Sequence, residues 1–291
     1  MTERATKFGS LQGDLSGLKD KGDFWLTRVP GLYLSIERFR EWVNWDKRVY
    51  LSFIRPGDVV VDVGANVGAH TVFFSHLVGA RGSVLSFEPL PENIAAMRAL
   101  LARRARFDNV TIVQSAVGNP GDATTAVLRV PGSDSTQASL QPQLAGSWER
   151  EPDIRSLTCP ITSLDADPRV GSLERISFIK IDVEGGELDT LKGAAGTIVR
   201  HRPLVHCEAY EKWTRPFGYG PSDLMQFARS LGYREARVIT DGMVHAHDLD
   251  SKIPERWFAT SSDVLFVLDE HRHLLRRFDR RYLERSRAIA V

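Results

Sequence analysis

The sequence predicts a doubly wound, mostly parallel α/β sheet with helices on both faces. Short β-branched runs alternate with amphipathic segments from residue 51 to about residue 268, the pattern of consecutive βαβ units. The first run, Val59–Val63, has the apolar character of a strand buried on both faces, and a glycine-containing turn, Gly64 to Gly68, follows it. Right-handed crossovers between parallel strands place the helices on both faces.

A turn at Pro56-Gly57 leads into the first strand, because proline presets one backbone dihedral and glycine accepts positive φ. The helix after the glycine turn is expected over Thr71–Leu77 and should end near Gly79. Pro91 opens the next helix, since a first turn does not need its missing N–H. Further strands are expected at Val84–Phe87, Val110–Gln114, Ile176–Ile181, Leu204–Cys207 and Val264–Leu268.

Side-chain spacing predicts the helices of the C-terminal half. One helix is expected between the fourth and fifth strands, because apolar residues recur there at helical spacing, at Leu188, Leu191, Ala195 and Ile198. After the fifth strand, Ser222 is a good N-cap for a helix that Gly232 ends.

Three regions depart from this rhythm. Residues 1–50 form an aromatic-rich N-terminal extension that includes Trp25 and Trp42 and lacks strand-like alternation. Residues 51–268 form the α/β domain, which the polar stretch 131–156 interrupts as either a mobile insertion or a substrate loop. Residues 269–291 carry seven arginines among apolar residues spaced three to four apart, which predicts a basic amphipathic helix against the domain or a partner.

The composition is that of a globular, enzyme-sized protein and excludes several classes. The 291 residues are 42% hydrophobic and 26% charged, unlike a disordered or collagen-like chain. The 38 basic and 37 acidic residues give a formal charge of +1, so no general attraction to nucleic acid is expected. We find no apolar run long enough for a transmembrane segment, no secretory leader and no disulfide framework. The expected location is the cytoplasm.

The loop Asp62-Val-Gly-Ala-Asn-Val-Gly68 lies where doubly wound sheets bind ligands, at the carboxyl end of a strand. Gly64 and Gly68 let the backbone approach a ligand, and the following helix N-terminus attracts an anion. A dinucleotide site has glycine at the position of Asn66, so approach of a pyrophosphate is obstructed. Asp62 can receive an ammonium group, so the loop fits an amino-acid head group.

Glu88 follows the second strand, 24 positions after Gly64. An acid at this place accepts hydrogen bonds from both ribose hydroxyls of a nucleoside. Ser115 and Ala116, after the third strand, are placed to flank an adenine edge. An amino-acid head together with a nucleoside describes S-adenosyl-L-methionine, which is the expected cofactor.

Four motifs in this order resemble the FkbM family of S-adenosylmethionine-dependent methyltransferases: Asp62-Val-Gly-Ala-Asn-Val-Gly68, Phe87-Glu-Pro89, Ala116-Val-Gly118 and Ile179-Lys-Ile-Asp-Val-Glu-Gly185. The resemblance covers about residues 51–268 and implies a class I, Rossmann-like methyltransferase fold. It also implies O-methylation of hydroxyls on sugars, glycolipids or polyketides. Carried over by residue, Asp62, Gly64, Asn66 and Gly68 would hold the methionine part, and Glu88 the ribose.

Methyl transfer to a hydroxyl needs an acceptor oxygen that is positioned and activated. Asp182 and Glu208 end the fourth and fifth strands, which are neighbours in such a sheet, so both acids are expected at the methyl side of the cofactor. By analogy with catechol O-methyltransferases, their oxygens predict a Mg²⁺ site. His206 shares a strand face with Glu208 and is an alternative base, or else a core histidine bonded to the backbone.

The predicted function is S-adenosylmethionine-dependent O-methylation of a small-molecule hydroxyl, on a sugar, a glycoside or a polyketide natural product. A nicotinamide-dependent oxidoreductase would use the same fold and the same ribose acid, although Asn66 argues against it. A binding module that keeps the cofactor pocket without turnover is the other alternative. No nucleic-acid partner is expected, because an Asn-Pro-Pro-Tyr-like motif is absent, and a homo-oligomer stays open.

Overall fold

The computed structural model describes residues 27–30, 32–33, 45–132, 134–143, 146–149, 153–240, 242–260 and 262–289. The strands of the larger sheet are β1 (Val59–Val63), β2 (Ser83–Phe87), β3 (Val110–Val113), β7 (Phe178–Ile181), β8 (Leu204–Glu208), β9 (Glu235–Thr240), β10 (Met243–Asp248) and β11 (Ser262–Val267). The α-helices are α3 (Trp45–Phe53), α4 (Ala69–Val78), α5 (Pro91–Arg104), α6 (Pro168–Gly171), α7 (Glu187–Lys192), α8 (Ala195–His201), α9 (Glu211–Thr214), α10 (Pro221–Ser230) and α11 (Arg272–Ile289). Each predicted strand is present, with bounds that differ by at most two residues.

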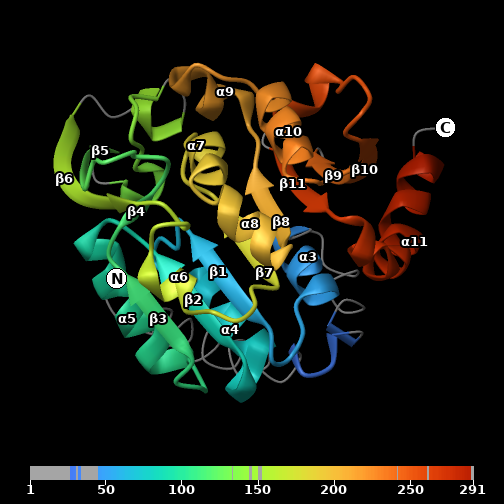
Figure 1. Ribbon diagram of the computed structural model, residues 1–291, viewed down its shortest axis with the longest axis horizontal. Coiled ribbons are helices and arrows are strands. Elements are labelled where there is room, and N and C mark those ends of the chain that lie inside the picture. The colour runs from blue at the N-terminus through green and yellow to red at the C-terminus, as the bar shows by residue number, and fades with distance from the viewer. Residues whose placement is uncertain are drawn as a thin grey trace, which may run out of the picture.

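The larger sheet has the strand order β10-β9-β11-β8-β7-β1-β2-β3, and helices cover both of its faces (Figure 1). Strands β8, β7, β1, β2 and β3 are neighbours in this order, and each is parallel to the next. In contrast, β11 runs antiparallel to β8 and β9, and β10 runs antiparallel to β9. The predicted doubly wound, mostly parallel sheet is confirmed. The chain runs outward from β1 to β3 and then returns to β7 on the other side of β1, which makes β1 the switch point where such sheets bind ligands.

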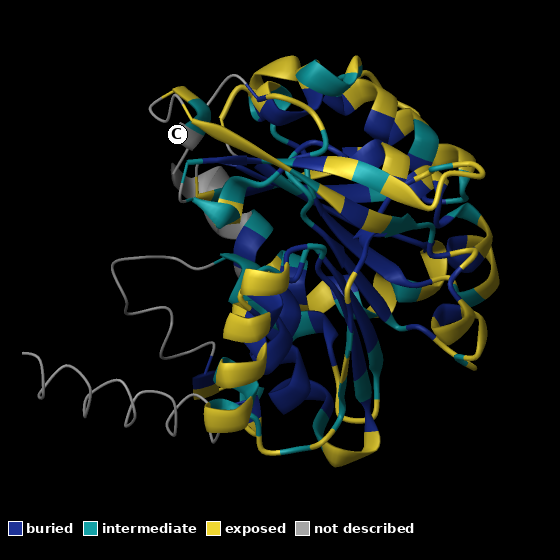
Figure 2. Cartoon of the chain, turned by 90° about the vertical axis from the view of Figure 1, so that its left-hand side faces the viewer, coloured by how far each residue is buried: buried dark blue, intermediate teal, exposed yellow. Residues whose placement is uncertain are grey.

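The sheet is buried on both faces because alternate strand residues enter two apolar cores. Val61 of β1 belongs to a core shared with α7, α8 and α10. Val60, pointing the other way, belongs to a core shared with α3, α4 and α11. Figure 2 shows the result: the strands of the larger sheet are largely buried, and most exposed residues lie on the outer sides of the helices and in the loops.

The single helix predicted between β7 and β8 is wrong, because the chain forms two helices there, α7 and α8. Gly193 lies at the break, where a Cβ would come within 1.9 Å of the carbonyl oxygen of Gly118. The second helix starts afresh because the Asp165 carboxylate accepts the N–H groups of Gly196 and Thr197, at 2.8 and 2.6 Å. Apolar spacing alone did not indicate this close approach.

The polar stretch 131–156 connects the strands of a β-hairpin. Its strands, β5 (Thr125–Pro131) and β6 (Ile154–Thr162), are antiparallel, and β6 also pairs with β4 (Ala116–Val117) to complete a three-stranded sheet. The hairpin was not predicted from the sequence because most residues of β6 are exposed and form no apolar run. The described part of the connection includes two short 3₁₀ helices, at Ser135–Gln137 and Gly146–Glu149.

The two ends of the chain differ in how much the structure describes. The predicted C-terminal helix is α11, and it packs on the domain through the buried side chains Leu275, Phe278 and Tyr282. Positions 1–26, 31 and 34–44, with Trp25 and Trp42, lie outside the described residues. Across the described ranges, no helix has the length and apolar character needed to cross a bilayer.

Candidate functional site

A cavity of about 220 Å³ lies at the carboxyl ends of β1, β2 and β7. Six of the predicted site residues line it: Gly64, Asn66, Glu88, Ser115, Ala116 and Asp182. Residues of the hairpin connection complete the wall, among them Ser135 and Leu140. The structure therefore brings most of the predicted cofactor residues to one place and puts the polar insertion over them.

The glycines of the loop after β1 are required by protein contacts on its inner side. Gly64 and Gly68 have φ values of 75° and 84°, in the left-handed region that favours glycine. A Cβ on Gly64 would lie 1.8 Å from the carbonyl oxygen of Asp182. A Cβ on Gly68 would lie 2.4 Å from Cγ of Met97, and Gly68 is not among the residues lining the cavity. The sequence predicts that these glycines let a ligand approach the backbone. In the structure, atoms of Asp182 and Met97 occupy the space beside them.

The backbone N–H groups of residues 64–68 are all used within the protein. The first two donate to the carbonyl oxygen of Phe87, and the last donates to that of Ala65. The N–H of Asn66 donates to Glu88 Oε2 at 2.8 Å, and the Asn66 side-chain oxygen accepts the next N–H at 2.7 Å. A phosphate-binding loop needs such groups to point at the anion. The loop is therefore poorly suited to a pyrophosphate.

Glu88 links the loop after β1 to the start of α5. Besides accepting from Asn66, its carboxylate accepts hydrogen bonds from the N–H of Leu90 at 2.9 Å and from Asn93 Nδ2 at 3.2 Å. Burial raises the pKa of this carboxyl, and the Leu90 and Asn66 N–H groups partly offset the increase. The carboxylate is thus held at the cavity wall by groups of the protein, in a place consistent with the predicted ribose contact.

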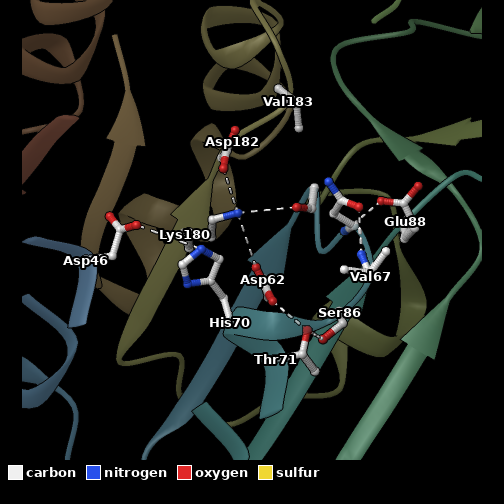
Figure 3. A network of polar contacts seen from close by, with 12 residues as sticks. Asp46, Asp62, Val67, His70, Thr71, Ser86, Glu88, Lys180, Asp182 and Val183 are labelled. Atoms are coloured by element: carbon white, nitrogen blue, oxygen red, sulfur yellow. Dashed lines mark hydrogen bonds and ion pairs between the residues drawn. The ribbon is translucent and has the colours of Figure 1, made fainter. Parts of the chain in front are cut away.

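Lys180, which was not assigned a role from the sequence, lies among the buried parallel strands and is one of the residues lining the cavity (Figure 3). Its Nζ lies 3.1 Å from Asp182 Oδ2 and 3.8 Å from Asp62 Oδ1, and donates to the Gly64 carbonyl oxygen at 3.2 Å. Burial alone would lower the pKa of this ammonium, but Asp182 and Asp62 raise that pKa above its usual value. Lys180 is therefore charged, and it lowers the pKa of Asp182 despite burial of that carboxyl.

The two aspartates beside Lys180 differ in their access to the cavity. Asp62 is fully buried, accepts a hydrogen bond from the Thr71 hydroxyl at 2.6 Å, and is not among the lining residues. The Asp182 side chain is 40% exposed and is part of the wall. In this structure the carboxylate available to an ammonium group is that of Asp182, and Asp62 instead supports the lysine from below.

His206 and Glu208 lie behind the cavity wall rather than on it. Burial lowers the pKa of His206 to about 4, and its Nε2 has no hydrogen-bond partner among the described residues. Burial also raises the pKa of Glu208, and the nearby acids Asp182 and Glu184 add to this increase. Asp182 and Glu208 are thus electrostatic neighbours. An ion between Asp182 and Glu208 would compete with Lys180 for the Asp182 carboxylate. The Mg²⁺ site and the catalytic base that the sequence predicts therefore stay predictions.

The hairpin connection is fastened beside the cavity at two places. Ser135 Oγ donates to Asn93 Oδ1 at 2.8 Å. Ser139 Oγ and Gln143 Nε2 both donate to the carbonyl oxygen of Glu184, at 2.7 and 2.8 Å. Glu184 has a φ of 55°, unusual for a residue with a side chain, which is typical of turns held by their surroundings at functional sites.

The turn after β7 is held by Glu187. Its Oε1 accepts the N–H groups of Val183 and Gly185, both at 3.1 Å, and its Oε2 lies 3.2 Å from the Tyr219 hydroxyl. Burial raises the pKa of Glu187 to about 7, although these N–H groups favour the ionised form.

Because the folded-state pKa of Glu187 is raised, its protonated form stabilises the fold below the unfolded pKa of about 4.3, and this contribution is lost as the pH rises through about 7. Glu187→Gln keeps both acceptor and donor functions and should remove this loss. We expect the variant to be more stable than wild type at about pH 8, by on the order of 2–3 kcal/mol in urea unfolding, with a smaller difference at about pH 5. The control is Glu211→Gln, at an acid whose side chain is 44% exposed. Equal pH slopes for wild type and Glu187→Gln would contradict the assignment.

The comparison that decides the family covers most of the elements around this cavity. A model of the methyltransferase FkbM domain matches residues 62–235, more than half of the chain. The chain belongs to the FkbM methyltransferase family. Asp62, the first matched residue, is also the first residue of the glycine loop. For this FkbM-family chain the predicted class I, Rossmann-like fold agrees with the strand order and with the antiparallel β11.

Individual relatives of this FkbM-family chain are distant. It is 25% identical over 184 residues to "Methyltransferase 1" of Beauveria bassiana, which covers 59% of this chain and 72% of the relative. It is 29% identical over 154 residues to the hexuronic acid methyltransferase AglP of Haloferax volcanii, covering 52% of this chain and 56% of AglP. It is 29% identical over 161 residues to the 31-O-demethyl-FK506 methyltransferase FkbM of Streptomyces tacrolimicus, covering 48% of this chain and 60% of that protein. The chain thus spans less than two thirds of the length of the last two.

Among solved structures, a methyltransferase FkbM from Methylobacillus flagellatus KT aligns with 76% of this chain and 50% of its own, with a TM-score of 0.42 and 18% identity.

Three polar residues of the FkbM-family site were missed as site residues in the sequence: Lys180, Asn93 and Gln143. Lys180 had a usable signal, because a charge between Ile179 and Ile181 in a buried strand is rarely left without a partner. Asn93 and Gln143 had none, since the contacts that tie them to the hairpin connection and to the turn after β7 join residues 42 and 41 positions apart in the chain.

Proposed function

We propose that this chain transfers the methyl group of S-adenosylmethionine to a hydroxyl oxygen of a small molecule. The observation that carries the proposal is the cavity itself, which combines Glu88, a glycine loop whose N–H groups are already used, and the partly exposed carboxylate of Asp182. Such a wall suits a nucleoside bearing an amino-acid head and disfavours paired phosphates. S-adenosylmethionine supplies an electrophilic methyl group when bound.

Each wall residue then has a binding role that follows from its chemistry. Glu88 accepts hydrogen bonds from the ribose hydroxyls, and Ser115 and Ala116 flank the adenine. The loop at Gly64 and the carboxylate of Asp182 hold the methionine head. A hydroxyl acceptor beyond the methyl group needs a base, and Glu208, with its raised pKa, is a stronger base than an ordinary carboxylate once it is ionised. His206 is the alternative base predicted from the sequence, but its pKa of about 4 makes it a weaker base than Glu208.

The acceptor class that we propose is a sugar, a glycoside or a polyketide natural product. One relative is named a hexuronic acid methyltransferase, and another is named for a 31-O position of FK506. These two names support the acceptor class that we propose.

The test is an assay of the purified chain with S-adenosylmethionine and a panel of uronic acids, glycosides and hydroxylated macrolides. We expect equal amounts of S-adenosylhomocysteine and of a product that is heavier than the acceptor by one methylene unit. Tight NAD binding without S-adenosylmethionine binding would instead favour the oxidoreductase alternative. Donor binding without a product across the panel would favour a non-catalytic module.

The hairpin connection should control how long the donor stays bound. The double substitution Ser139→Ala with Gln143→Ala removes both hydrogen bonds to the Glu184 carbonyl oxygen. We expect S-adenosylhomocysteine to dissociate about 5–30-fold faster from the variant, the equivalent of one or two lost hydrogen bonds. Stopped-flow displacement measures this rate. Thr158→Ala, an exposed change on β6, is the control, and an unchanged dissociation rate in the double variant would contradict the role of the connection.

A further inference from the structure

We propose that Asp46, His206 and Asp263 bind one divalent transition-metal ion of the manganese-to-zinc series. One ligand-type atom from each of these side chains lies within 4.8 Å of the other two. The residues come from α3, β8 and β11, so the fold brings them together from distant parts of the chain. This is a different ligand set from the Mg²⁺ site predicted at Asp182 and Glu208.

The strand register accounts for two of the ligands. His206 lies directly beside Lys180 in the neighbouring strand, and Lys180 lies beside Asp62 in the next. All three face the side of the sheet that α3 and α4 cover, together with Leu204 and Leu265 of the same core. Asp263 pairs with Glu208, which lies two residues after His206 in β8 and therefore on the same face of the sheet. Lys180 is already engaged by Asp62 and Asp182.

A second observation points to an occupant at this cluster. His206 is 2% exposed, and its Nε2 has no hydrogen-bond partner in the described part of the chain. The hydroxyl of Tyr50, four positions after Asp46 on the same helix, is equally buried and equally without a partner there. The two rings meet edge to face, with centroids 5.6 Å apart. Buried polar atoms are nearly always bonded to protein, water or an ion, so these two indicate a missing partner.

The donor set indicates which ion. Two carboxylate oxygens and one imidazole nitrogen suit Mn²⁺, Fe²⁺ or Zn²⁺, whereas Mg²⁺ prefers oxygen ligands and keeps its waters. Three ligand atoms that each lie about 2.1 Å from a common ion cannot all be more than about 3.6 Å apart, so a cluster with separations of up to 4.8 Å has to close by up to about 1.2 Å around the ion. Three protein ligands leave coordination positions open, as catalytic sites do and closed structural sites do not.

The cluster adjoins the proposed methyltransferase cavity. His70 belongs to the cavity wall, and its Nε2 lies 3.8 Å from Asp46 Oδ2 on the other side (Figure 3). An ion at the cluster would therefore be next to the space beyond the donor, where it could bind an oxygen of the acceptor. Ion binding does not require the donor, so it can be tested separately from the proposed function.

The test is a titration of the chelator-treated full chain with Mn²⁺, followed by electron paramagnetic resonance, with Zn²⁺ competition. Wild type should bind one Mn²⁺, with ¹⁴N modulation from a coordinated imidazole. Asp46→Asn and Asp263→Asn should each weaken binding about 10–100-fold, and His206→Gln should remove the ¹⁴N signal. Asp189→Asn, an exposed acid paired with Lys192, is the matched control and should change nothing. Circular dichroism and S-adenosylhomocysteine binding on the same samples confirm that each variant is folded.

Three results would overturn the assignment. The first is a folded wild-type chain that binds neither Mn²⁺ nor Zn²⁺. The second is Mn²⁺ binding that Asp46→Asn and Asp263→Asn leave unchanged. The third is binding that only Asp182→Asn and Glu208→Gln abolish, which would place the ion at the other carboxylates. If S-adenosylhomocysteine still binds in these cases, the proposed function stands while the metal site fails.

Discussion

Lys180→Met should lower the free energy of unfolding by about 3–5 kcal/mol at about pH 7, the usual cost of breaking a buried ion pair by removing one partner. The Lys180 side chain is 5% exposed and has Asp182 and Asp62 within 3.1 and 3.8 Å. Without the ammonium, Asp62 in particular is left as a buried carboxylate with no cation beside it. Methionine keeps an unbranched apolar stem, so the decrease in the free energy of unfolding reflects the lost charge more than lost packing. Urea unfolding followed by circular dichroism measures it.

The pH dependence of this effect has a definite sign. The pKa of Lys180 is raised in the folded state, so its contribution is present below the unfolded lysine pKa and is lost only in strong alkali. The pKa of Asp182 is lowered, so its contribution is present above the unfolded aspartate pKa and is lost as the pH falls through the folded value. The difference between wild type and Lys180→Met should therefore be flat from about pH 6 to 9 and shrink below about pH 4.

Two further variants separate the ion network from a general effect of losing a lysine. Lys192→Met removes an exposed charge paired with Asp189 at 3.4 Å and should change stability by less than about 0.5 kcal/mol. Adding Asp182→Asn to Lys180→Met should recover part of the loss, because one of the two uncompensated acids is gone. A loss below about 1 kcal/mol for Lys180→Met alone would show that the network does not hold this part of the sheet.

Glu88→Ala should weaken binding of S-adenosylhomocysteine by about 10–150-fold, or about 1.4–3 kcal/mol. Two causes act together. The ribose hydroxyls lose a charged acceptor, and the N–H groups of Asn66 and Leu90 lose the carboxylate that orders the loop after β1 and the start of α5. Isothermal titration calorimetry measures the affinity. The effect should exceed that of any other single wall substitution, because no other wall side chain joins these two segments.

Two further variants serve as controls for Glu88→Ala: one removes a nearby acid, and the other replaces Glu88 by a side chain of similar size. Glu92→Ala, in the first turn of α5, removes an exposed acid that pairs with Arg155 and should leave affinity unchanged. Glu88→Gln keeps the acceptor oxygen for one N–H and should lose less affinity than Glu88→Ala. Wild-type affinity in Glu88→Ala would remove the ribose role from this residue.

The parallel core of the fold was predictable because its strands are buried on both faces. Val59–Val63 and Leu204–Cys207 are apolar runs that need no partner to be recognised. Strands with one polar side are harder: β6 is mostly exposed, and β10 alternates Val244 with His245. β6 was absent from the expected strands, and so was β9, although five of its six residues are buried. The break between α7 and α8 was missed because its cause, contact of Gly193 with Gly118, is tertiary.

The candidate site divides in the same way. Gly64, Asn66 and Glu88 belong to local motifs whose spacing carries the prediction, and all three line the cavity. The cluster of Asp46, His206 and Asp263 has no such spacing, since strand pairing and the packing of α3 create it. Burial also changed one expectation: Asp62 has the right place in the motif, but it is enclosed with Thr71 and Lys180.

A crystal structure of the chain with S-adenosylhomocysteine shows where the nucleoside binds. We expect the nucleoside in the cavity at the ends of β1, β2 and β7, with its ribose hydroxyls on Glu88 and its amino-acid head between the Gly64 loop and Asp182. Electron density for the ligand elsewhere on the chain, with this cavity empty, would contradict the proposed nucleoside site.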